Sequence, residues 1–277
     1  STWEKLTEQF WLDTRVPLSN DLDDWSKLSP AEKDLIGKVF GGLTLLDTMQ
    51  SESGVEAIRN DCRTQHEEAV LNNIQFMEAV HAKSYSSIFS TLNTKKEIED
   101  IFEWTNNNEY LQKKAKIINE IYERGSALEK KVASVFLESF LFYSGFFTPL
   151  YYLGNNKMAN VAEIIKLIIR DESVHGTYIG YKFQLGFNEL PEEEQAKLRD
   201  WLYELLFELY ENEEKSNEIL VEIDNALNNN VVSQPVIQQS QNYNYTQEVQ
   251  PQTYQSNQQQ ATTRSQSTTT RRTTRSR

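Results

Sequence analysis

The sequence predicts an all-α protein in which long helices pack into a bundle, and three observations support this fold class. Apolar residues recur at helical spacing, for example at Phe76, Val80, Ile88 and Phe89. Glycine and proline are scarce, with 10 and 6 among 277 residues, so long segments run without a helix breaker. No alternating pattern bounded by turn residues competes as a strand. Long helices with short connections bury their apolar faces against one another, as in a helical bundle.

The first long helix has the clearest start. Ser29 can cap its N-terminus, Pro30 suits the first helical position, and Glu32 places an acid in the first turn. We expect this helix to continue to about Glu52. Six further helices are expected at residues 65–90, 95–104, 107–125, 127–152, 159–185 and 191–226.

Length and composition fit one large domain with a buried core, which we expect at residues 1–228. No stretch approaches the roughly 20 apolar residues of a membrane span. The first ten residues, STWEKLTEQF, lack the pattern of a secretory signal. Cys62 is the single cysteine, which excludes an internal disulfide and is typical of a reducing compartment. We therefore expect a cytoplasmic protein and interpret Cys62 as an ordinary thiol.

Charge is distributed unevenly along the chain. The net charge is −13, yet residues 225–277 carry five arginines and a single acid, Glu248, so residues 1–224 hold a net charge of −17. An acidic body of this kind is a poor candidate for nucleic-acid binding. Residues 229–277 are rich in Gln, Ser, Thr and Asn and have little to bury, so a disordered tail is expected there.

Two of the three histidines stand in the same local pattern. Glu78 precedes His81 by three residues, and Glu172 precedes His175 by three. Residues three apart on a helix share a face, so each pair can offer a carboxylate and an imidazole to one ion. The third histidine, His66, lacks this spacing and is expected at the surface.

Two further acids stand inside apolar runs, Asp47 in GLTLLDTM and Glu138 in VASVFLESFLFYSGF. Such an acid is costly to bury unless it is paired or binds a cation. A di-metal carboxylate bundle takes one Glu-x-x-His pair from each of two helices and one carboxylate from each of the other two, and these ligands suit iron or manganese. The alternative is a set of separately solvated acids and two core histidines. It leaves unexplained why each of them faces an apolar helix surface.

Four segments resemble the small subunit of class I ribonucleotide reductase, above all its class Ib branch: GLTLLDT, MEAVHAKSYSSIFSTL, VASVFLESFLFYSGF and LIIRDESVHGTYIGYKFQ. The resemblance covers roughly residues 8–215. It implies a ferritin-like helical bundle with a buried di-metal carboxylate site. That site would hold two manganese or two iron ions per chain, with an oxo or hydroxo bridge. The resemblance implies six protein ligands: Asp47, Glu78, His81, Glu138, Glu172 and His175.

The resemblance also implies a radical site at Tyr85, four residues after His81. In the family, the matching tyrosine is oxidised by the assembled metal site and kept as a stable radical. Phe142, Phe146 and Ile168 match the apolar lining of the radical pocket. Without the resemblance, Tyr85 would be interpreted as a core tyrosine with a hydrogen-bonded hydroxyl.

Two more residues match the path by which the family moves the radical toward its large subunit. They are Trp11 and Asp171, and His81 links them to the metal site. The alternative for Trp11 is a packing tryptophan near the N-terminus.

The function implied by the resemblance is that of an oxidoreductase, the small subunit of ribonucleoside-diphosphate reductase. Its tyrosyl radical serves the large subunit, which reduces ribonucleotides to the deoxyribonucleotides of DNA replication. The implied partners are the large subunit, a second copy of the chain in a homodimer, and a flavodoxin-like activase. Neither a nucleic acid nor a membrane is an expected partner.

The C-terminal part departs from the family pattern. The family continues beyond the ELYENE segment into further helices and a tail that docks into the large subunit, whereas here the closing helices are expected to be missing. This difference bears on whether the final layer of the bundle is complete and on how the chain would dock to the large subunit. Two alternatives remain open: a ferritin-like di-metal oxidase or iron-storage protein, and a non-catalytic truncated remnant with an interaction tail. The first is disfavoured by Asp47, Tyr85 and the Trp11–Asp171 pair.

Overall fold

The computed structural model of the chain describes residues 1–227, and in this part every regular element is helical. The predicted all-α fold is therefore confirmed for these residues. The disordered tail predicted at residues 229–277 lies outside the described residues.

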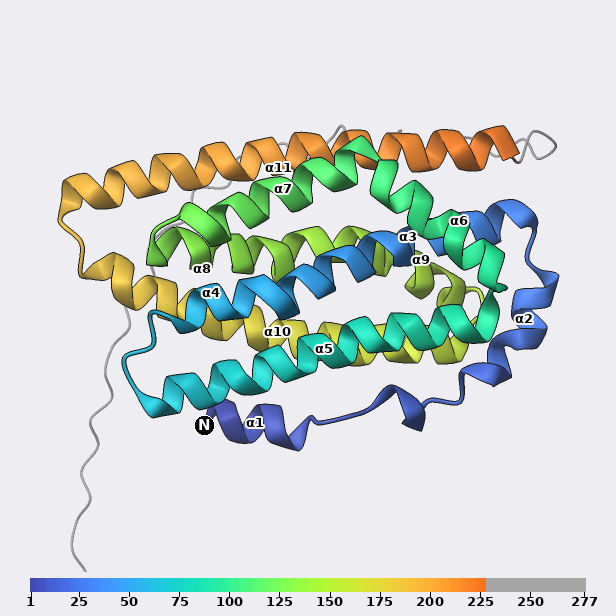
Figure 1. Ribbon diagram of the computed structural model, residues 1–277, viewed down its shortest axis with the longest axis horizontal. Coiled ribbons are helices and arrows are strands. Elements are labelled where there is room, and N and C mark those ends of the chain that lie inside the picture. Colours follow the sequence, from blue (N-terminus) through green and yellow to red (C-terminus); the bar gives the residue numbers. More distant parts are fainter. Residues whose placement is uncertain (228–277) are drawn as a thin grey trace, which may run out of the picture. The chain divides into compact units, whose positions relative to one another are not determined.

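Four helical rods form the centre of the bundle (Figure 1). The second rod is a single helix, α5 (Gln65–Leu92), and the fourth is α10 (Ala159–Asn188). The first and third rods each contain a π-helical turn between two α-helices. They are α3 (Pro30–Met49), η3 (Gln50–Gly54) and α4 (Val55–Arg59) in the first, and α8 (Ala127–Phe136), η4 (Leu137–Leu141) and α9 (Phe142–Gly154) in the third.

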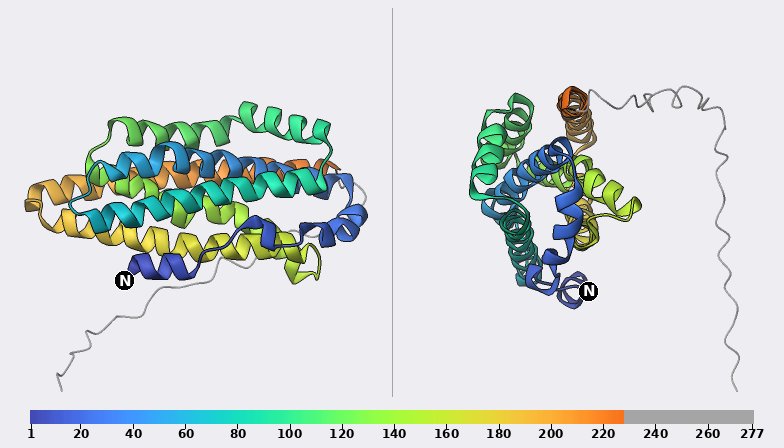
Figure 2. Two further views of the ribbon diagram at one scale, coloured as in Figure 1. Left: turned by 60° about the horizontal axis from the view of Figure 1, so that its bottom comes forward. Right: turned by 90° about the vertical axis from the view of Figure 1, so that its right-hand side faces the viewer.

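The remaining helices cover these rods. The hairpin of α6 (Lys95–Asn107) and α7 (Glu109–Arg124) and the long α11 (Glu192–Leu227) lie outside them in the end-on view of Figure 2. The N-terminal segment runs along α5 and α10 (Figure 1). It contains four short helices that the sequence analysis did not predict: α1 (Thr2–Glu8), the 3-10 turns η1 (Asp13–Arg15) and η2 (Leu18–Asp21), and α2 (Leu22–Lys27).

The predicted helix boundaries agree with the structure within a few residues, and the predicted cap at Ser29 is confirmed. The Ser29 hydroxyl accepts a hydrogen bond from the Glu32 backbone N–H at 3.2 Å, and the Glu32 carboxylate accepts one from the Ser29 backbone N–H at 2.7 Å. The main difference is the pair of π turns, where uninterrupted helices were expected. A π turn inserts one residue into an α-helix and is frequent at functional sites.

Two aspartates fix the N-terminal segment to the start of α10. The Asp21 carboxylate accepts hydrogen bonds from the backbone N–H groups of Asn160 and Val161, at 3.1 and 2.7 Å. Asp24 accepts one from the backbone N–H of Met158 at 2.9 Å. These bonds satisfy N–H groups that a helix leaves free at its N-terminus. They also hold the segment that carries Trp11 alongside α10.

The core runs through the middle of the bundle, and its largest fully buried side chains include Tyr85, Phe40, Phe89 and Phe142. Phe76, by contrast, is 52% exposed and stacks on Phe10 with ring centroids 6.1 Å apart, so it does not belong to the core face predicted for it. By length and composition alone, Ala127–Gly154 could cross a membrane, which the sequence analysis did not anticipate. Half of its most apolar stretch is buried in the bundle, as the packing of a core helix requires.

Candidate di-metal centre

Six side chains from all four central rods meet in the middle of the bundle. Each of these side chains is at most 1% exposed to solvent. The first rod contributes one carboxylate from α3, and the third contributes one from the π turn η4. The second and fourth rods each contribute a carboxylate and an imidazole three residues apart. These residues are the six predicted ligands: Asp47, Glu78, His81, Glu138, Glu172 and His175.

The six residues form two overlapping ligand sets. In each set, one potential ligand atom per residue lies within 4.8 Å of the others. Glu78 and Glu172 belong to both sets. Asp47 and His81 complete one set, and Glu138 and His175 complete the other. Two adjacent ion positions that share two carboxylates are the arrangement of a di-metal carboxylate bundle.

Most of the potential ligand atoms have no hydrogen-bond partner among the described residues. This holds for both carboxylate oxygens of Asp47 and of Glu172, for one oxygen each of Glu78 and Glu138, and for Nδ1 of His81. Buried polar atoms are almost always satisfied, since leaving one unpaired costs on the order of 1–3 kcal/mol. So many unsatisfied atoms in one place fit a pair of metal ions, whose bonds would satisfy them together.

Burial raises the pKa of two of the carboxyl groups. It raises the pKa of Asp47 to about 8, with a further contribution from the charges of Glu78 and Glu172. It also raises the pKa of Glu138 well above its usual value, and the same two charges add to this. Metal ligands must be deprotonated, so binding of ions here would release protons.

The two imidazoles are the cationic partners of these carboxylates within the described residues, and none of the four pairs with a lysine or arginine there. Burial opposes protonation of His81, but its hydrogen bond to Asp171 and the nearby carboxylates of Asp47, Glu172 and Glu78 raise its pKa well above the usual value. Burial also opposes protonation of His175, but Glu172 and Glu78 outweigh it and raise the pKa of His175 to about 10. Hydrogen bonds from the two imidazoles likewise outweigh burial at Glu78 and lower its pKa to about 2.

The structure brings Trp11, Asp171 and His81 together, as the resemblance predicted. The indole Nε1 of Trp11 donates a hydrogen bond to Asp171 Oδ2 at 2.6 Å, and the same oxygen lies 3.2 Å from Nε2 of His81. The Trp11 and His81 rings stack with centroids 5.9 Å apart. Because Asp171 engages Nε2, the other nitrogen of His81, Nδ1, is the one directed at the carboxylates.

Tyr85 is fully buried one helical turn beyond His81, and its hydroxyl has no hydrogen-bond partner among the described residues. Burial, followed by the charges of Asp47 and Glu172, raises the pKa of Tyr85 well above its usual value, so the phenol keeps its proton. The predicted lining residues Phe142, Phe146 and Ile168 are buried and belong to the same hydrophobic cluster as Tyr85.

His66 is exposed near the start of α5, which confirms the prediction that it is a surface residue. The sequence analysis missed three polar residues that contact Glu138 directly or through one another: Gln50, Tyr122 and Ser134. Gln50 follows Asp47 by three residues and Ser134 precedes Glu138 by four, so helical spacing could have indicated both. Tyr122 has no comparable signal, because it comes from α7.

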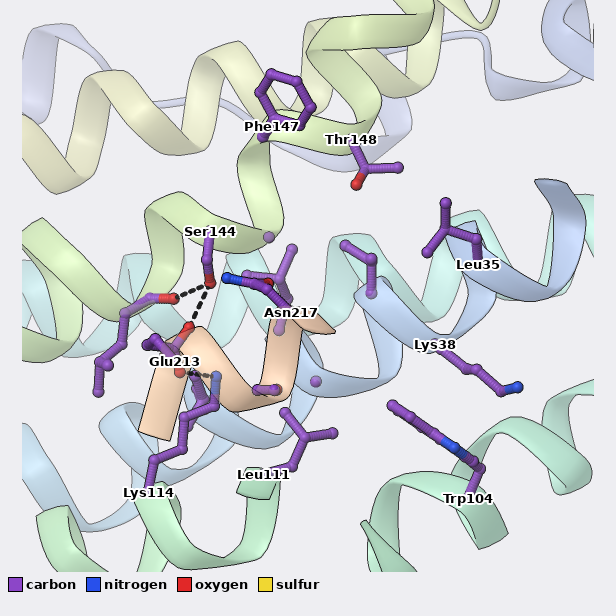
Figure 3. Close-up of a pocket in the computed structure, with 17 residues that line it drawn as sticks. Leu35, Lys38, Trp104, Leu111, Lys114, Ser144, Phe147, Thr148, Glu213 and Asn217 are labelled. Atoms are coloured by element: carbon purple, nitrogen blue, oxygen red, sulfur yellow. Dashed lines mark hydrogen bonds and ion pairs between the residues drawn. The ribbon is translucent and has the colours of Figure 1, made fainter. Parts of the chain in front are cut away.

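A second buried polar cluster lies between α7, α9 and α11. Lys114 forms an ion pair with Glu213, and each side chain is at most 6% exposed. The Ser144 hydroxyl donates a hydrogen bond to the other oxygen of Glu213 at 2.7 Å. Figure 3 shows these three residues on the wall of a pocket of about 420 Å³, which is also lined by Leu111 and Phe147.

Comparison with known proteins gives a consistent result. Residues 1–238 match the model of the family described as ribonucleotide reductase, small chain. The chain is 55% identical over 211 residues to the ribonucleoside-diphosphate reductase subunit beta of Mycobacterium leprae, and 54% identical over 211 residues to the subunit beta nrdF2 of Mycobacterium tuberculosis. Each alignment covers 76% of this chain and 65% of the relative, so the chain spans about two thirds of the length of these relatives.

Among solved structures, the chain is similar to the crystal structure of Streptococcus sanguinis dimanganese(II)-NrdF. The two share 78% sequence identity and a TM-score of 0.78, and the match covers 82% of each chain. The buried cluster of carboxylates and imidazoles on four rods, the family match over residues 1–238 and this structural similarity all agree. The chain therefore belongs to the ribonucleotide reductase small-chain family.

Proposed function

We propose that the chain acts as the small subunit of a ribonucleoside-diphosphate reductase, in which a di-metal centre generates and stores a tyrosyl radical for the large subunit. The observation that carries this proposal is the geometry around the cluster. A buried tyrosine, Tyr85, and a hydrogen-bonded line from His81 through Asp171 to Trp11 both adjoin the ligand set that contains Asp47 and His81. A storage or oxidase site needs the ligand sets but has no use for that line.

The proposed ligands are the six buried side chains of the two sets. The donor set of four carboxylates and two imidazoles suits manganese or iron, and similarity to the dimanganese(II) protein of S. sanguinis supports manganese. When bound, the pair of ions supplies the oxidising power for one-electron chemistry. Carboxylates suit such a site because each can bind through one oxygen or two.

Tyr85 is the proposed radical site. Its oxidation removes one electron from the ring and the proton from the hydroxyl. The carboxylates of Asp47 and Glu172 act on this hydroxyl and, together with burial, keep the proton on the phenol until the ring is oxidised. Phe142, Phe146 and Ile168 exclude water and hydrogen donors from the ring, which protects a stored radical from being quenched.

Trp11 and Asp171 are the proposed exit for the oxidising equivalent. As an electron leaves the indole, its Nε1 proton can pass along the 2.6 Å hydrogen bond to Asp171. Asp171 also fixes the ring of His81 through Nε2, so one carboxylate orients a metal ligand and holds a proton for Trp11.

The proposed partners follow from the same function. They are the large subunit, which binds and reduces the ribonucleotide, a second copy of this chain in a homodimer, and a flavodoxin-like activase. The proposed location is the cytoplasm. Mixing the purified chain with a class Ib large subunit should give nucleotide reduction. A radical-bearing chain without activity in this assay would retain the radical function and contradict the proposed partnership.

Electron paramagnetic resonance tests the radical. The purified chain, loaded anaerobically with Fe(II) and then exposed to O2, should give a tyrosyl signal. Tyr85→Phe should abolish this signal while both metals stay bound, whereas Tyr178→Phe, a half-buried tyrosine of another cluster, should leave it unchanged. A signal that survives in Tyr85→Phe would refute the assignment, and two bound ions without any signal would point to an oxidase.

Metal analysis tests the ligands. Glu138→Ala or His175→Ala should reduce binding from two ions to one, because both residues belong to the same ligand set. Full metal loading of Glu138→Ala would contradict the ligand assignment.

A further inference from the structure

A buried hydrogen-bond network beside Glu138 has no role in the function proposed above. Gln50, the first residue of the π turn η3, is fully buried. Its amide Nε2 donates hydrogen bonds to Glu138 Oε1 and to the Ser134 hydroxyl, the latter at 2.8 Å. The Tyr122 hydroxyl, from α7, donates a hydrogen bond to the amide oxygen of Gln50 at 2.6 Å. The two π turns are therefore joined at the candidate metal centre, since Glu138 lies in η4.

The network makes the two oxygens of Glu138 inequivalent. Oε1 accepts from Gln50 and also from the Ser134 hydroxyl, at 3.1 Å. Oε2 has no hydrogen-bond partner among the described residues. Asp47, the corresponding carboxylate of the other ligand set, has both oxygens without such a partner in the described part of the chain. The protein thus holds one carboxylate oxygen of Glu138 by hydrogen bonds, whereas it holds neither oxygen of Asp47 in this way.

Tyr122 and Glu138 together determine which way the Gln50 amide points. An amide has one oxygen that accepts and an NH2 group that donates twice, and a carboxylate only accepts. The NH2 group therefore faces Ser134 and Glu138, and the amide oxygen on the other side accepts from the Tyr122 hydroxyl. A flipped amide would place its oxygen against the Glu138 carboxylate, and two acceptors at hydrogen-bond distance repel each other.

Gly54 provides the space for this arrangement. A Cβ atom at this position would lie 2.0 Å from the Gln50 amide oxygen and 2.8 Å from the Tyr122 ring. The φ angle of Gly54 is −67°, which any residue adopts, so space rather than backbone conformation requires glycine here.

We propose that Gln50, oriented by Tyr122, is a positioning residue that holds Oε1 of Glu138 and leaves Oε2 to bind a metal ion. The network would thereby set the affinity of the ion position formed with His175 separately from that of the position formed with Asp47 and His81. This inference rests on the proposed di-metal function.

Mn(II) titration of the full chain under anaerobic conditions tests the inference, with free and bound Mn(II) followed by electron paramagnetic resonance. Gln50→Leu should weaken one of the two binding steps by about 10–100-fold, as loss of a residue that orients a ligand typically does. It should also change the spectrum of the bound pair. Tyr122→Phe removes a single oxygen atom and should weaken the same step by a smaller factor.

Two controls separate positioning from general damage to the fold. Gln75→Leu removes a hydrogen bond of 2.8 Å to the backbone carbonyl of Ser51, in the same π turn, and one from the Arg59 guanidinium, but does not touch Glu138, so both binding steps should be unchanged. Gly54→Ala should reproduce the effect of Gln50→Leu, whereas Gly180→Ala, where a Cβ meets only Val135 at 3.8 Å, should not.

The possible outcomes can be told apart. If Gln50→Leu and Tyr122→Phe leave both binding steps and the spectrum unchanged, the positioning role is wrong and the di-metal function stays intact. An equal weakening of both steps would also overturn it, because the network contacts only Glu138. Failure of the unaltered chain to bind Mn(II) would instead refute the proposed function itself.

Discussion

Two clusters of buried acidic side chains in the bundle are satisfied in opposite ways. At the candidate di-metal centre, four carboxylates face two imidazoles, and most ligand atoms have no hydrogen-bond partner among the described residues. Between α7, α9 and α11, Glu213 has an ion-pair partner in Lys114 and a hydrogen bond from Ser144 (Figure 3). Both clusters are nearly inaccessible to water.

The difference shows which buried acids are built for a ligand. A buried carboxylate with a cation and a hydrogen-bond donor from its own chain is complete as folded. At the di-metal centre, two imidazoles are the cationic partners of four carboxylates, and most ligand atoms still lack a hydrogen bond, so the centre is incomplete until something outside the chain binds. The Glu213 cluster should therefore need no ligand to be satisfied. The di-metal centre should reach its full contribution to stability only when ions are bound.

The largest expected effect comes from breaking the Lys114–Glu213 pair. Lys114→Met leaves the Glu213 carboxylate buried without its cation, and we expect it to lower the free energy of unfolding by about 3–5 kcal/mol. The double variant Lys114→Met/Glu213→Leu removes both charges and should recover most of this loss. Urea unfolding measures both. A single variant as stable as the intact chain would mean that water reaches Glu213.

Metal removal should produce the next largest effect, at the other cluster. An ion present at about 100–1,000 times its dissociation constant stabilises the folded state by roughly 2.7–4.1 kcal/mol. Chelation should therefore lower the melting temperature by roughly 10 °C. The Lys114→Met/Glu213→Leu variant should lose the same amount on chelation as the intact chain, since its changes lie outside the ligand sets. No change on chelation would contradict the proposed ligands.

The same contrast explains what the sequence could predict. Asp47 and Glu138 stand in apolar runs, and helical spacing placed Glu78 with His81 and Glu172 with His175, so local pattern was enough for the six proposed ligands. Glu213 lies in the polar segment ENEE and is buried only because α11 packs against α7. No local pattern reports such a contact.

The π turns and Tyr122 were missed for a related reason. The segment that becomes η3, QSESG, has no apolar periodicity that would distinguish π from α geometry. Its Gly54 is explained by the Gln50 amide oxygen and by the Tyr122 ring, which comes from a helix about 70 residues further along the chain. The short helices α1 and α2 were also missed. Ser1 and Glu4 did carry a capping-box signal for α1.

One serine in each cluster allows a comparison of single hydrogen bonds, with a smaller expected change in stability. Ser144 donates to Glu213, and Ser134 donates to Glu138. Ser144→Ala should destabilise the chain by about 1.5–3 kcal/mol, the usual range for a hydrogen bond to a charged group. Ser134→Ala should cost less when no metal is bound, because burial raises the pKa of Glu138 and so disfavours the charged form that the hydroxyl would stabilise. Urea unfolding after chelation compares the two variants, and equal losses would contradict the distinction.

The finest distinction between the two clusters is a dependence of stability on pH that only the di-metal centre should show. Burial raises the pKa of Asp47 to about 8, so the folded state holds this proton more tightly than the unfolded state. Its contribution to stability is lost as pH rises toward 8. Although burial opposes protonation at His175, Glu172 and Glu78 raise its pKa to about 10, so its contribution also falls, as pH rises from about 6.5 to 10. Glu78, whose pKa is lowered to about 2, contributes a constant amount above about pH 5.

Between about pH 5 and 9, the chelated chain should therefore lose stability steadily as pH rises. The metal-loaded chain should lose less, because its ligands are already deprotonated. Asp47→Asn should flatten the dependence of the chelated chain by removing one of the titrating groups of the centre. The Lys114→Met/Glu213→Leu variant should keep it, since neither charge of that pair belongs to the ligand sets. Urea unfolding across this range distinguishes the two clusters. If the pH dependence disappears in Lys114→Met/Glu213→Leu but persists in Asp47→Asn, the titrating groups belong to the Glu213 cluster, and the prediction is wrong.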